Sequence, residues 1–495
     1  MTVHRIEWLV TGLCMGLLAI VPRVFWPTDP PTILQVEIGL GLITAMMLFR
    51  AVDSRPTWRP EAKGRRVMWR LVQLVCVLFL FPTFLWMHAS GFMVATMVSS
   101  TLGVTFGVAE VTVLALCLWQ ALRVPERRPM AQIVASITFF LGCFQFVVWA
   151  VWMWSPPSAD TCRAVDLPDH VSLLSPAEWA QDASQPYDLL YIQEEGWLMG
   201  SFKMAGNGGV PFLDSETSNR VLGVDTKDPT RRFVVPLTGR QLPQYMTYNA
   251  ATHELLVSRL GGSTSWLDVL DLSALPEAKV ARAVTVPYST HEVVTHPTKP
   301  LFGVFSDIGE FSLMGQEDLS VRETTEMRRP GDHSLVTMHA WHRPGSSKVY
   351  VSSLFYPLAE LDIDTLEVRW TGPLFGGGQL TGDPTTERIF QTDILLHRVD
   401  IIGMTSMALE SRLELDYAPR PVVVDSARDL LIVGGWLDGV VRFYRLSDLS
   451  LRAEQAYVGP YLRDLAYDPK RGQLFAGSQC GLYQVDLPAV LGASF

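Results

Sequence analysis

Five long apolar stretches occupy the first third of the chain. Each is long enough for a helix that crosses the hydrocarbon core of a bilayer, which takes about 20 residues. The last stretch ends in a cluster of tryptophans, a residue type that settles at membrane interfaces. The pattern predicts an all-α polytopic membrane domain over residues 1–154, with transmembrane helices at Trp8–Phe25, Ile33–Phe49, Leu71–Met87, Phe92–Leu122 and Met130–Trp154.

Short β-rich runs separated by polar turns fill the chain from about residue 186 onward. A hydrophobic pair followed by Asp recurs at intervals of about 40–47 residues, which is the period of a propeller blade. The clearest copies end at Asp225, Asp271, Asp362, Asp400 and Asp486. Seven such units, each with room for four short strands, predict an all-β seven-bladed propeller over residues 186–495.

A turn about 17–22 residues before each of these Asp residues leads into a strand of Val, Ile, Leu and Phe. Asp383-Pro384 and Asp468-Pro469 stand at this turn in two units, and His296-Pro297 stands there in another. Turn and terminal Asp together resemble the YVTN-type β-propeller repeat over about residues 185–490. The resemblance implies a propeller but no single activity, because that family spans binding proteins, lyases, lactonases and quinoprotein-like enzymes.

Residues 155–185 link the two predicted domains and can also help to close the ring. The last unit ends near Asp486, which leaves only residues 488–495 for its fourth strand. Either that tail completes the last blade, or a strand from about residues 164–174 does so. The sequence leaves both arrangements open.

Positive charge is confined to alternate loops between the predicted helices. Seven Lys and Arg residues lie in 50–70 and three in 123–129, whereas the loops 27–32 and 88–91 contain none. Cytoplasmic loops carry an excess of Lys and Arg. We therefore expect a cytoplasmic N-terminus and, after five crossings, an extracytoplasmic or periplasmic propeller on an integral protein of the cytoplasmic membrane.

Net charge changes sign at the end of the predicted membrane domain. Residues 1–154 carry 12 Lys and Arg against 7 Asp and Glu, a net charge of +5, and the remaining 28 and 43 give residues 155–495 a net charge of −15. An acidic domain of this size repels nucleic acid. The partners that we expect are the lipid bilayer and either a protein or a small anionic ligand on the propeller.

Three ionisable residues lie within the predicted helices, where charge is costly. Arg23 and Glu37 lie at similar depth near the outer ends of consecutive helices and can form an ion pair. Glu110 lies deep in the fourth helix. It can relay protons, or it can be protonated and hydrogen-bonded to a neighbouring helix.

Two of the six cysteines, Cys162 and Cys480, fall outside the predicted helices. An oxidising compartment permits a disulfide between them, which would join the start of the soluble domain to its last blade. Two unpaired thiols are the alternative.

Residues that open the innermost strand of each blade line the axis of a propeller. Counting back four or five positions from each turn gives Thr337, Met338 and a set of candidate ligand-binding residues: Tyr245, His291, Glu292, Gln379, Arg420, Arg463 and Asp464. Arginine presents a fork of donors that suits carboxylate or phosphate. The ring is therefore a candidate anion site, unless its charged groups pair with one another, as Arg463 can with Asp464 or Glu292.

No metal site, cofactor or catalytic motif is evident in the sequence. His-x-His, Cys-x-x-Cys, Gly-x-Ser-x-Gly, P-loop and dinucleotide motifs are all missing, and His296 occupies the position of a turn-capping Asp. The favoured hypothesis is a membrane-anchored binding, scaffold or sensor module. The alternatives are a lyase-like or lactonase-like enzyme acting through His291 and Glu292, and a subunit of a transport or signalling complex.

Overall fold

The computed structural model describes residues 167, 169–174 and 186–492, apart from 203–219, 240, 261–263, 307–308, 328–335, 355, 372–377, 395, 460 and 479. These residues belong to the C-terminal of two compact units, 156–495. The five predicted transmembrane helices lie outside the described residues, as do Arg23, Glu37, Glu110 and Cys162. In the part of the chain that is described, no helix has the length and apolar character needed to cross a membrane.

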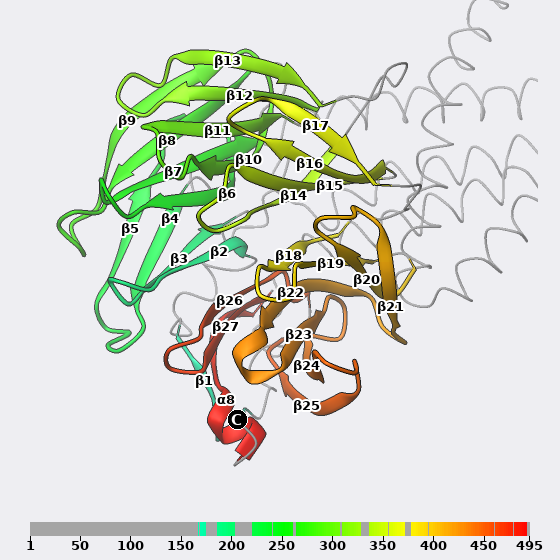
Figure 1. Ribbon diagram of the computed structural model, residues 1–495. Coiled ribbons are helices and arrows are strands. Elements are labelled where there is room, and N and C mark those ends of the chain that lie inside the picture. Colours follow the sequence, from blue (N-terminus) through cyan, green and yellow to red (C-terminus); the bar gives the residue numbers. More distant parts are fainter. Residues whose placement is uncertain are drawn as a thin grey trace, which may run out of the picture. The chain divides into compact units, whose positions relative to one another are not determined.

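The described residues form seven four-stranded antiparallel sheets, the blades of a propeller (Figure 1). From the axis outward, blade 1 consists of β2 (Pro186–Ile192), β3 (Trp197–Phe202), β4 (Arg220–Asp225) and β5 (Arg232–Pro236). Blade 2 consists of β6 (Leu242–Asn249), β7 (Glu254–Leu260), β8 (Ser265–Asp271) and β9 (Lys279–Val286). Blade 3 consists of β10 (Thr290–Thr295), β11 (Leu301–Ser306), β12 (Glu310–Gly315) and β13 (Val321–Glu326).

Blades 4 to 6 repeat this order. Blade 4 consists of β14 (Val336–His342), β15 (Lys348–Leu354), β16 (Tyr356–Asp362) and β17 (Glu367–Trp370). Blade 5 consists of β18 (Leu380–Asp383), β19 (Arg388–Asp393), β20 (Arg398–Gly403) and β21 (Leu409–Glu414). Blade 6 consists of β22 (Pro419–Asp425), β23 (Leu430–Gly435), β24 (Val440–Arg445) and β25 (Leu451–Tyr457), with a 3-10 turn η2 (Ser426–Arg428) between β22 and β23. The seven-bladed all-β fold expected from the repeat is confirmed.

The last blade is closed by a strand from the start of the domain. Its own strands are β26 (Asp464–Asp468), β27 (Gln473–Ser478) and β28 (Gly481–Asp486), and β1 (Val171–Leu173) pairs antiparallel with β28 as the fourth. The C-terminal tail instead forms the short helix α8 (Leu487–Leu491). Of the two arrangements that the sequence left open, the structure has the strand donated from residues 164–174.

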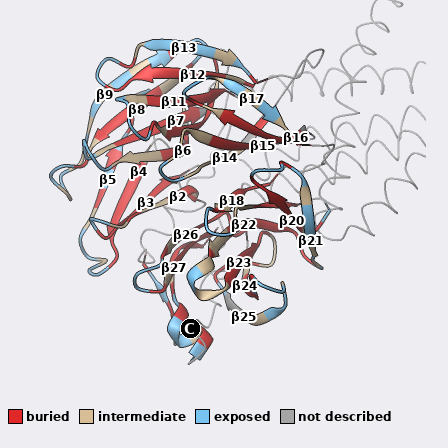
Figure 2. Ribbon diagram, viewed as in Figure 1, coloured by how far each residue is buried: buried red, intermediate tan, exposed pale blue. Residues whose placement is uncertain are grey.

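The core lies between neighbouring blades. The second strand of a blade is buried on both faces, as in β3 and β23, whereas outer strands such as β9 alternate between exposed and partly buried positions (Figure 2). Each adjacent pair of blades shares a hydrophobic cluster. At the seam between the last and first blades, the rings of Phe475 and Tyr191 lie 4.9 Å apart. Closure is therefore secured by packing as well as by β1.

Turn residues recognised in the sequence help to hold the first hairpin of their blades. Asp468 Oδ1 accepts a hydrogen bond from Lys470 N at 3.0 Å, and its Oδ2 accepts the hydroxyl of Tyr191 on the next blade at 2.9 Å. His296 Nδ1 accepts from Lys299 N at 3.1 Å. The turn-capping role predicted for His296 is confirmed.

Candidate ligand site at the propeller axis

The seven innermost strands, β2, β6, β10, β14, β18, β22 and β26, surround the centre of the domain (Figure 1), and each contacts the next, with β26 contacting β2. In five of them the ladder to the second strand is irregular near its opening: at Pro186/Asp188, Pro243/Met246, Thr290/Val293, Thr337/His339 and Pro419/Val422. A β-bulge leaves residues unpaired and redirects their side chains. The bulged residues include Tyr245, His291, Glu292, Met338 and Arg420, all of which the sequence had placed at the axis.

Hydroxyl side chains on the second strands fix the backbone of these axial residues. Each donates a hydrogen bond to a carbonyl at the opening of the next blade, which ties blade to blade around the axis. The donor and acceptor pairs are Ser201 with Gln244, Ser258 with His291, Ser352 with Gly378, and Thr392 with Arg420. The ring of backbone that carries the candidate site is therefore preorganised.

The seven candidate ligand-binding residues are all buried. Their exposed fractions run from 3% for Tyr245 and Glu292 to 7% for His291, Arg420 and Asp464. Side chains from different blades meet: the rings of Tyr245 and His291 lie 4.9 Å apart, and Gln379 Nε2 donates to Asp464 Oδ1 at 3.1 Å. The positions that the sequence grouped by counting are thus brought together in one polar cluster.

Aromatic faces, rather than carboxylates, hold the two axial arginines. Arg463 Cζ lies 4.3 Å from the ring centroid of Tyr187, and its Nη1 donates to the Tyr461 hydroxyl at 3.0 Å. Arg420 Cζ lies 5.2 Å from the ring of Trp436. Among the described residues neither guanidinium forms an ion pair, and the Nε of each has no acceptor. The internal pairing of Arg463 with Asp464 or Glu292 is absent there.

An acid pair lies beside the arginines, at the seam between the last and first blades. Asp464 Oδ1 accepts from Leu465 N at 2.9 Å as well as from Gln379, and its Oδ2 accepts from Leu189 N at 2.7 Å. Asp188 Oδ2 accepts from Met246 N at 2.8 Å.

The carboxyl groups of Asp188 and Asp464 also hydrogen-bond to each other, which requires a proton between them. Burial, together with the charge of Asp464, raises the pKa of Asp188 well above its usual value. Burial also raises the pKa of Asp464, to about 6. Asp464 has more donors around it, so Asp188 holds the shared proton.

On the third and fourth blades, burial favours the neutral forms of the imidazole and carboxyl groups at the axis. Burial lowers the pKa of His291 to about 3, and the charges of His339, Arg463 and Arg420 act in the same direction. Burial and Arg420 lower the pKa of His339 to about 3 as well. Burial and Asp188 raise the pKa of Glu292 well above its usual value. The two guanidinium groups are thus the dominant charges at the axis.

Asp188, Tyr187 and His339 belong to this cluster, although the sequence analysis did not place them there. His339 Nε2 lies 3.9 Å from Glu292 Oε1, and the rings of His339 and Tyr245 lie 5.6 Å apart. The bulge between Thr337 and His339 turns His339 to the axis. Asp188 could have been found by counting five positions back from Gln193, which follows β2. That turn, however, lacks the Asn, Asp or His that marks the turn of the other blades.

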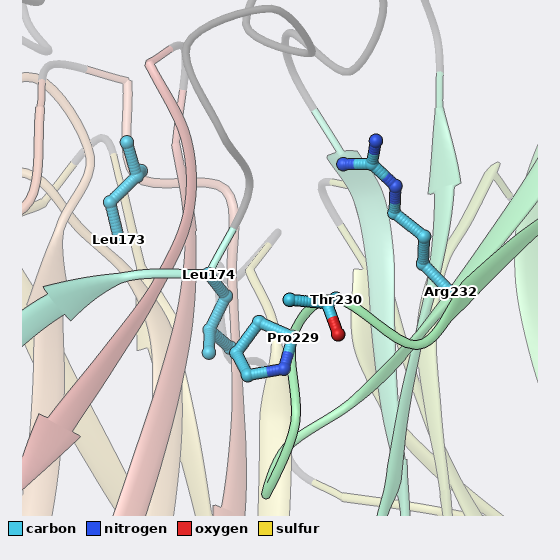
Figure 3. A pocket seen from close by; sticks show the side chains of 5 residues that line it. All are labelled: Leu173, Leu174, Pro229, Thr230 and Arg232. Carbon is cyan, nitrogen blue, oxygen red and sulfur yellow. The ribbon is translucent and has the colours of Figure 1, made fainter.

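A second concave feature lies at the seam of the ring, away from the axis. This pocket of about 360 Å³ is lined by Leu173, Leu174, Pro229, Thr230 and Arg232 (Figure 3). Arg232 is the only charged residue in the lining, so the pocket offers little chemistry that would select a ligand.

Cys480 is buried and disulfide-bonded. It is the only cysteine among the described residues, so its partner lies outside them. The pairing with Cys162 stays a prediction.

In the ranges that the structure describes, no three His, Cys, Asp or Glu side chains are grouped to hold a metal ion. The described groups at the axis that can bind a ligand are two buried arginines, an acid pair that shares a proton, and the aromatic rings around them. No protein-family model matches the chain, and no curated protein matches it.

Proposed function

We propose that the protein is a membrane-anchored, extracytoplasmic binding module whose propeller takes a small anion at its axis. The observation that carries this proposal is the pair Arg420 and Arg463, both buried and neither ion-paired among the described residues. A buried charge without a counter-ion is costly, and proteins retain such groups mainly where they act.

The balance of charge favours a monoanion such as a carboxylate. Arg420 and Arg463 contribute two positive charges, and the acid pair of Asp188 and Asp464 contributes one negative charge because it shares a proton. A carboxylate accepts the parallel N–H groups of a guanidinium. It would neutralise the remaining positive charge and give the Nε groups an acceptor.

The enzyme alternative is less well supported by the same groups. A lyase or lactonase mechanism would use His291 as a base, and an imidazole with its pKa lowered to about 3 is a weak base at neutral pH. Binding without chemistry explains the neutral imidazoles as polar lining. The third hypothesis, a subunit of a transport or signalling complex, depends on Glu110 and stays a prediction.

Membrane anchoring and extracytoplasmic placement are supported by two observations. The loops rich in Lys and Arg alternate with loops that contain neither, and Cys480 is disulfide-bonded, as in proteins of oxidising compartments. Digestion without reductant should release the Cys480 peptide joined to the Cys162 peptide. Two separate peptides that carry free thiols would count against the placement.

The binding proposal can be tested on the purified full-length chain with acetate as the probe. Unfolding temperature should rise with acetate concentration at constant ionic strength, with chloride as the reference anion, because a ligand that binds only the folded state stabilises it. Arg420→Gln should abolish this rise. The exposed Arg322, which pairs with Asp318 on a surface turn, supplies the matched control Arg322→Gln.

The unfolding temperature measured without acetate distinguishes a binding role from a structural role for Arg420. If the arginine served the fold, its loss would lower the unfolding temperature without acetate. If it serves a ligand, Arg420→Gln should leave that temperature unchanged or raise it, since an unpaired buried charge is removed. Equal acetate dependence in the wild type and in Arg420→Gln would refute the proposal.

A further inference from the structure

The axial cluster also contains a buried acceptor without a donor, namely Gln379 Oε1. Gln379 is 5% exposed and lies immediately before β18. A simple anion satisfies guanidinium groups but offers nothing to an amide oxygen. The unpaired acceptor therefore indicates that the ligand has a hydrogen-bond donor as well as a negative charge.

The orientation of the Gln379 amide is fixed by its neighbour. Its Nε2 donates to Asp464 Oδ1 at 3.1 Å. Rotating the amide by half a turn would place its oxygen against that carboxylate oxygen, so the nitrogen must face Asp464. The oxygen is left pointing away from the acid pair, without a partner among the described residues.

The backbone carbonyls of Gln379 and Arg420 lie close together on adjacent blades. The Thr392 hydroxyl contacts both backbone carbonyls, at 3.1 Å from that of Gln379 and 2.8 Å from that of Arg420. A ligand whose carboxylate meets Arg420 can thus present a nearby hydrogen-bond donor to Gln379. Glu292 Oε1 also lacks a partner, but it is less informative, because a carboxyl in its acid form can donate as well as accept.

We propose that the axial ligand is a 2-hydroxycarboxylate or 2-aminocarboxylate, whose carboxylate binds Arg420 and Arg463 and whose hydroxyl or amino group donates to Gln379 Oε1. This inference rests on the anion-binding function proposed above and narrows its ligand class. A donor on the carbon next to the carboxylate suits two side chains that start from neighbouring backbone positions, as those of Gln379 and Arg420 do. An unsubstituted carboxylate leaves the amide oxygen buried without a donor, which is unfavourable.

Two pairs of probes test the hydroxyl directly on the full-length protein: acetate with glycolate, and propionate with lactate. In each pair the second member differs by one hydroxyl group. By titration calorimetry the hydroxylated member should bind roughly tenfold more tightly, the usual consequence of leaving one buried polar group unpaired. Gln379→Met should reduce this preference to near unity while acetate still binds. Gln193→Met, at the turn after β2, is the matched control and should keep the preference.

The outcomes separate the two proposals. Equal affinity within both pairs in the wild type would overturn the ligand class, while acetate binding that depends on Arg420 would still support an anion site. A preference that survives Gln379→Met, or acetate binding lost together with it, would overturn the role of Gln379. Probes whose binding does not depend on Arg420 would overturn both proposals.

Discussion

Two nearly isosteric substitutions in the acid pair should have opposite effects on stability. Asp188 and Asp464 share one proton, and the hydrogen bonds assign it to Asp188. An Asn at 188 has the shape of the protonated acid: its oxygen can accept from Met246 N, and its NH2 group can donate to Asp464. Asp188→Asn should therefore preserve the hydrogen bonds of this side chain with Met246 N and with Asp464.

Asn at position 464 cannot preserve them. The Asp464 oxygens accept from Gln379 Nε2, Leu465 N and Leu189 N, and an amide has only one oxygen. At least one buried donor would lose its acceptor. The expected cost is about 1–3 kcal/mol at neutral pH.

The pH dependence gives the sign of the effect at 188. A carboxyl whose pKa is higher in the folded state than in the unfolded state binds more protons when folded, so stability falls as pH rises through that range. For Asp188 the range begins at its ordinary value of 3.8, because burial and the charge of Asp464 raise its pKa well above that value. While folded Asp188 keeps its proton, each pH unit above this value costs about 1.4 kcal/mol of stability.

Asp188→Asn removes this titration, because an amide does not ionise in this pH range. The variant should match the wild type below about pH 4, where both acids are protonated. It should become more stable than the wild type as pH rises toward 7. Asp464→Asn should be less stable than the wild type at pH 7.

The assay is thermal unfolding of the full-length protein, followed by tryptophan fluorescence at a series of pH values. The quantity of interest is the difference between variant and wild type, which cancels the titration of other groups. An Asp188→Asn curve parallel to the wild-type curve from pH 4 to 7 would refute the shared proton. Equal loss of stability in both variants would refute its assignment to Asp188.

Two further predictions concern the fold. Arg259 and Asp268 form a fully buried ion pair at 2.7 Å. Arg259→Met should therefore destabilise the domain by about 3–5 kcal/mol in urea unfolding, because it leaves the Asp268 charge buried without a partner, and adding Asp268→Leu should recover much of that loss. If the double variant recovers no stability, the loss comes from packing and not from the buried charge. Ser172 and Leu173 are adjacent on β1, and the alternation of the ladder points the N–H of Ser172 toward β28. Ser172→Pro should therefore lower the unfolding temperature by several degrees. Leu173→Pro should have a smaller effect, because the N–H of Leu173 points away from β28. Equal effects of the two substitutions would argue against closure of the ring by β1.

The positions of the axial residues could be predicted because blades repeat. A fixed count back from each turn reaches the opening of the inner strand, and in this way the sequence identified Tyr245, Gln379 and Arg463. The ladder between first and second strands sets that count within each blade, so no long-range information is needed.

The partners of these residues could not be predicted in the same way. Gln379 on the fifth blade donates to Asp464 on the seventh, passing over the sixth. Such contacts depend on how closely the blades approach the axis and on bulges that shift individual side chains. The bulge that brings in His339 leaves no clear trace in the sequence, where Met338 looks equally suitable.

Ring closure and the candidate ligand site depend on the same contacts. Asp464 belongs to the last blade, and its acceptor oxygens hold Leu189 N and the carboxyl of Asp188 on the first. The acid pair therefore forms only when the two ends of the propeller meet. Arg463, also on the last blade, stacks on Tyr187 of the first. A ligand that binds Arg463 and Arg420 draws on geometry that an open ring lacks, so binding and closure must stabilise each other.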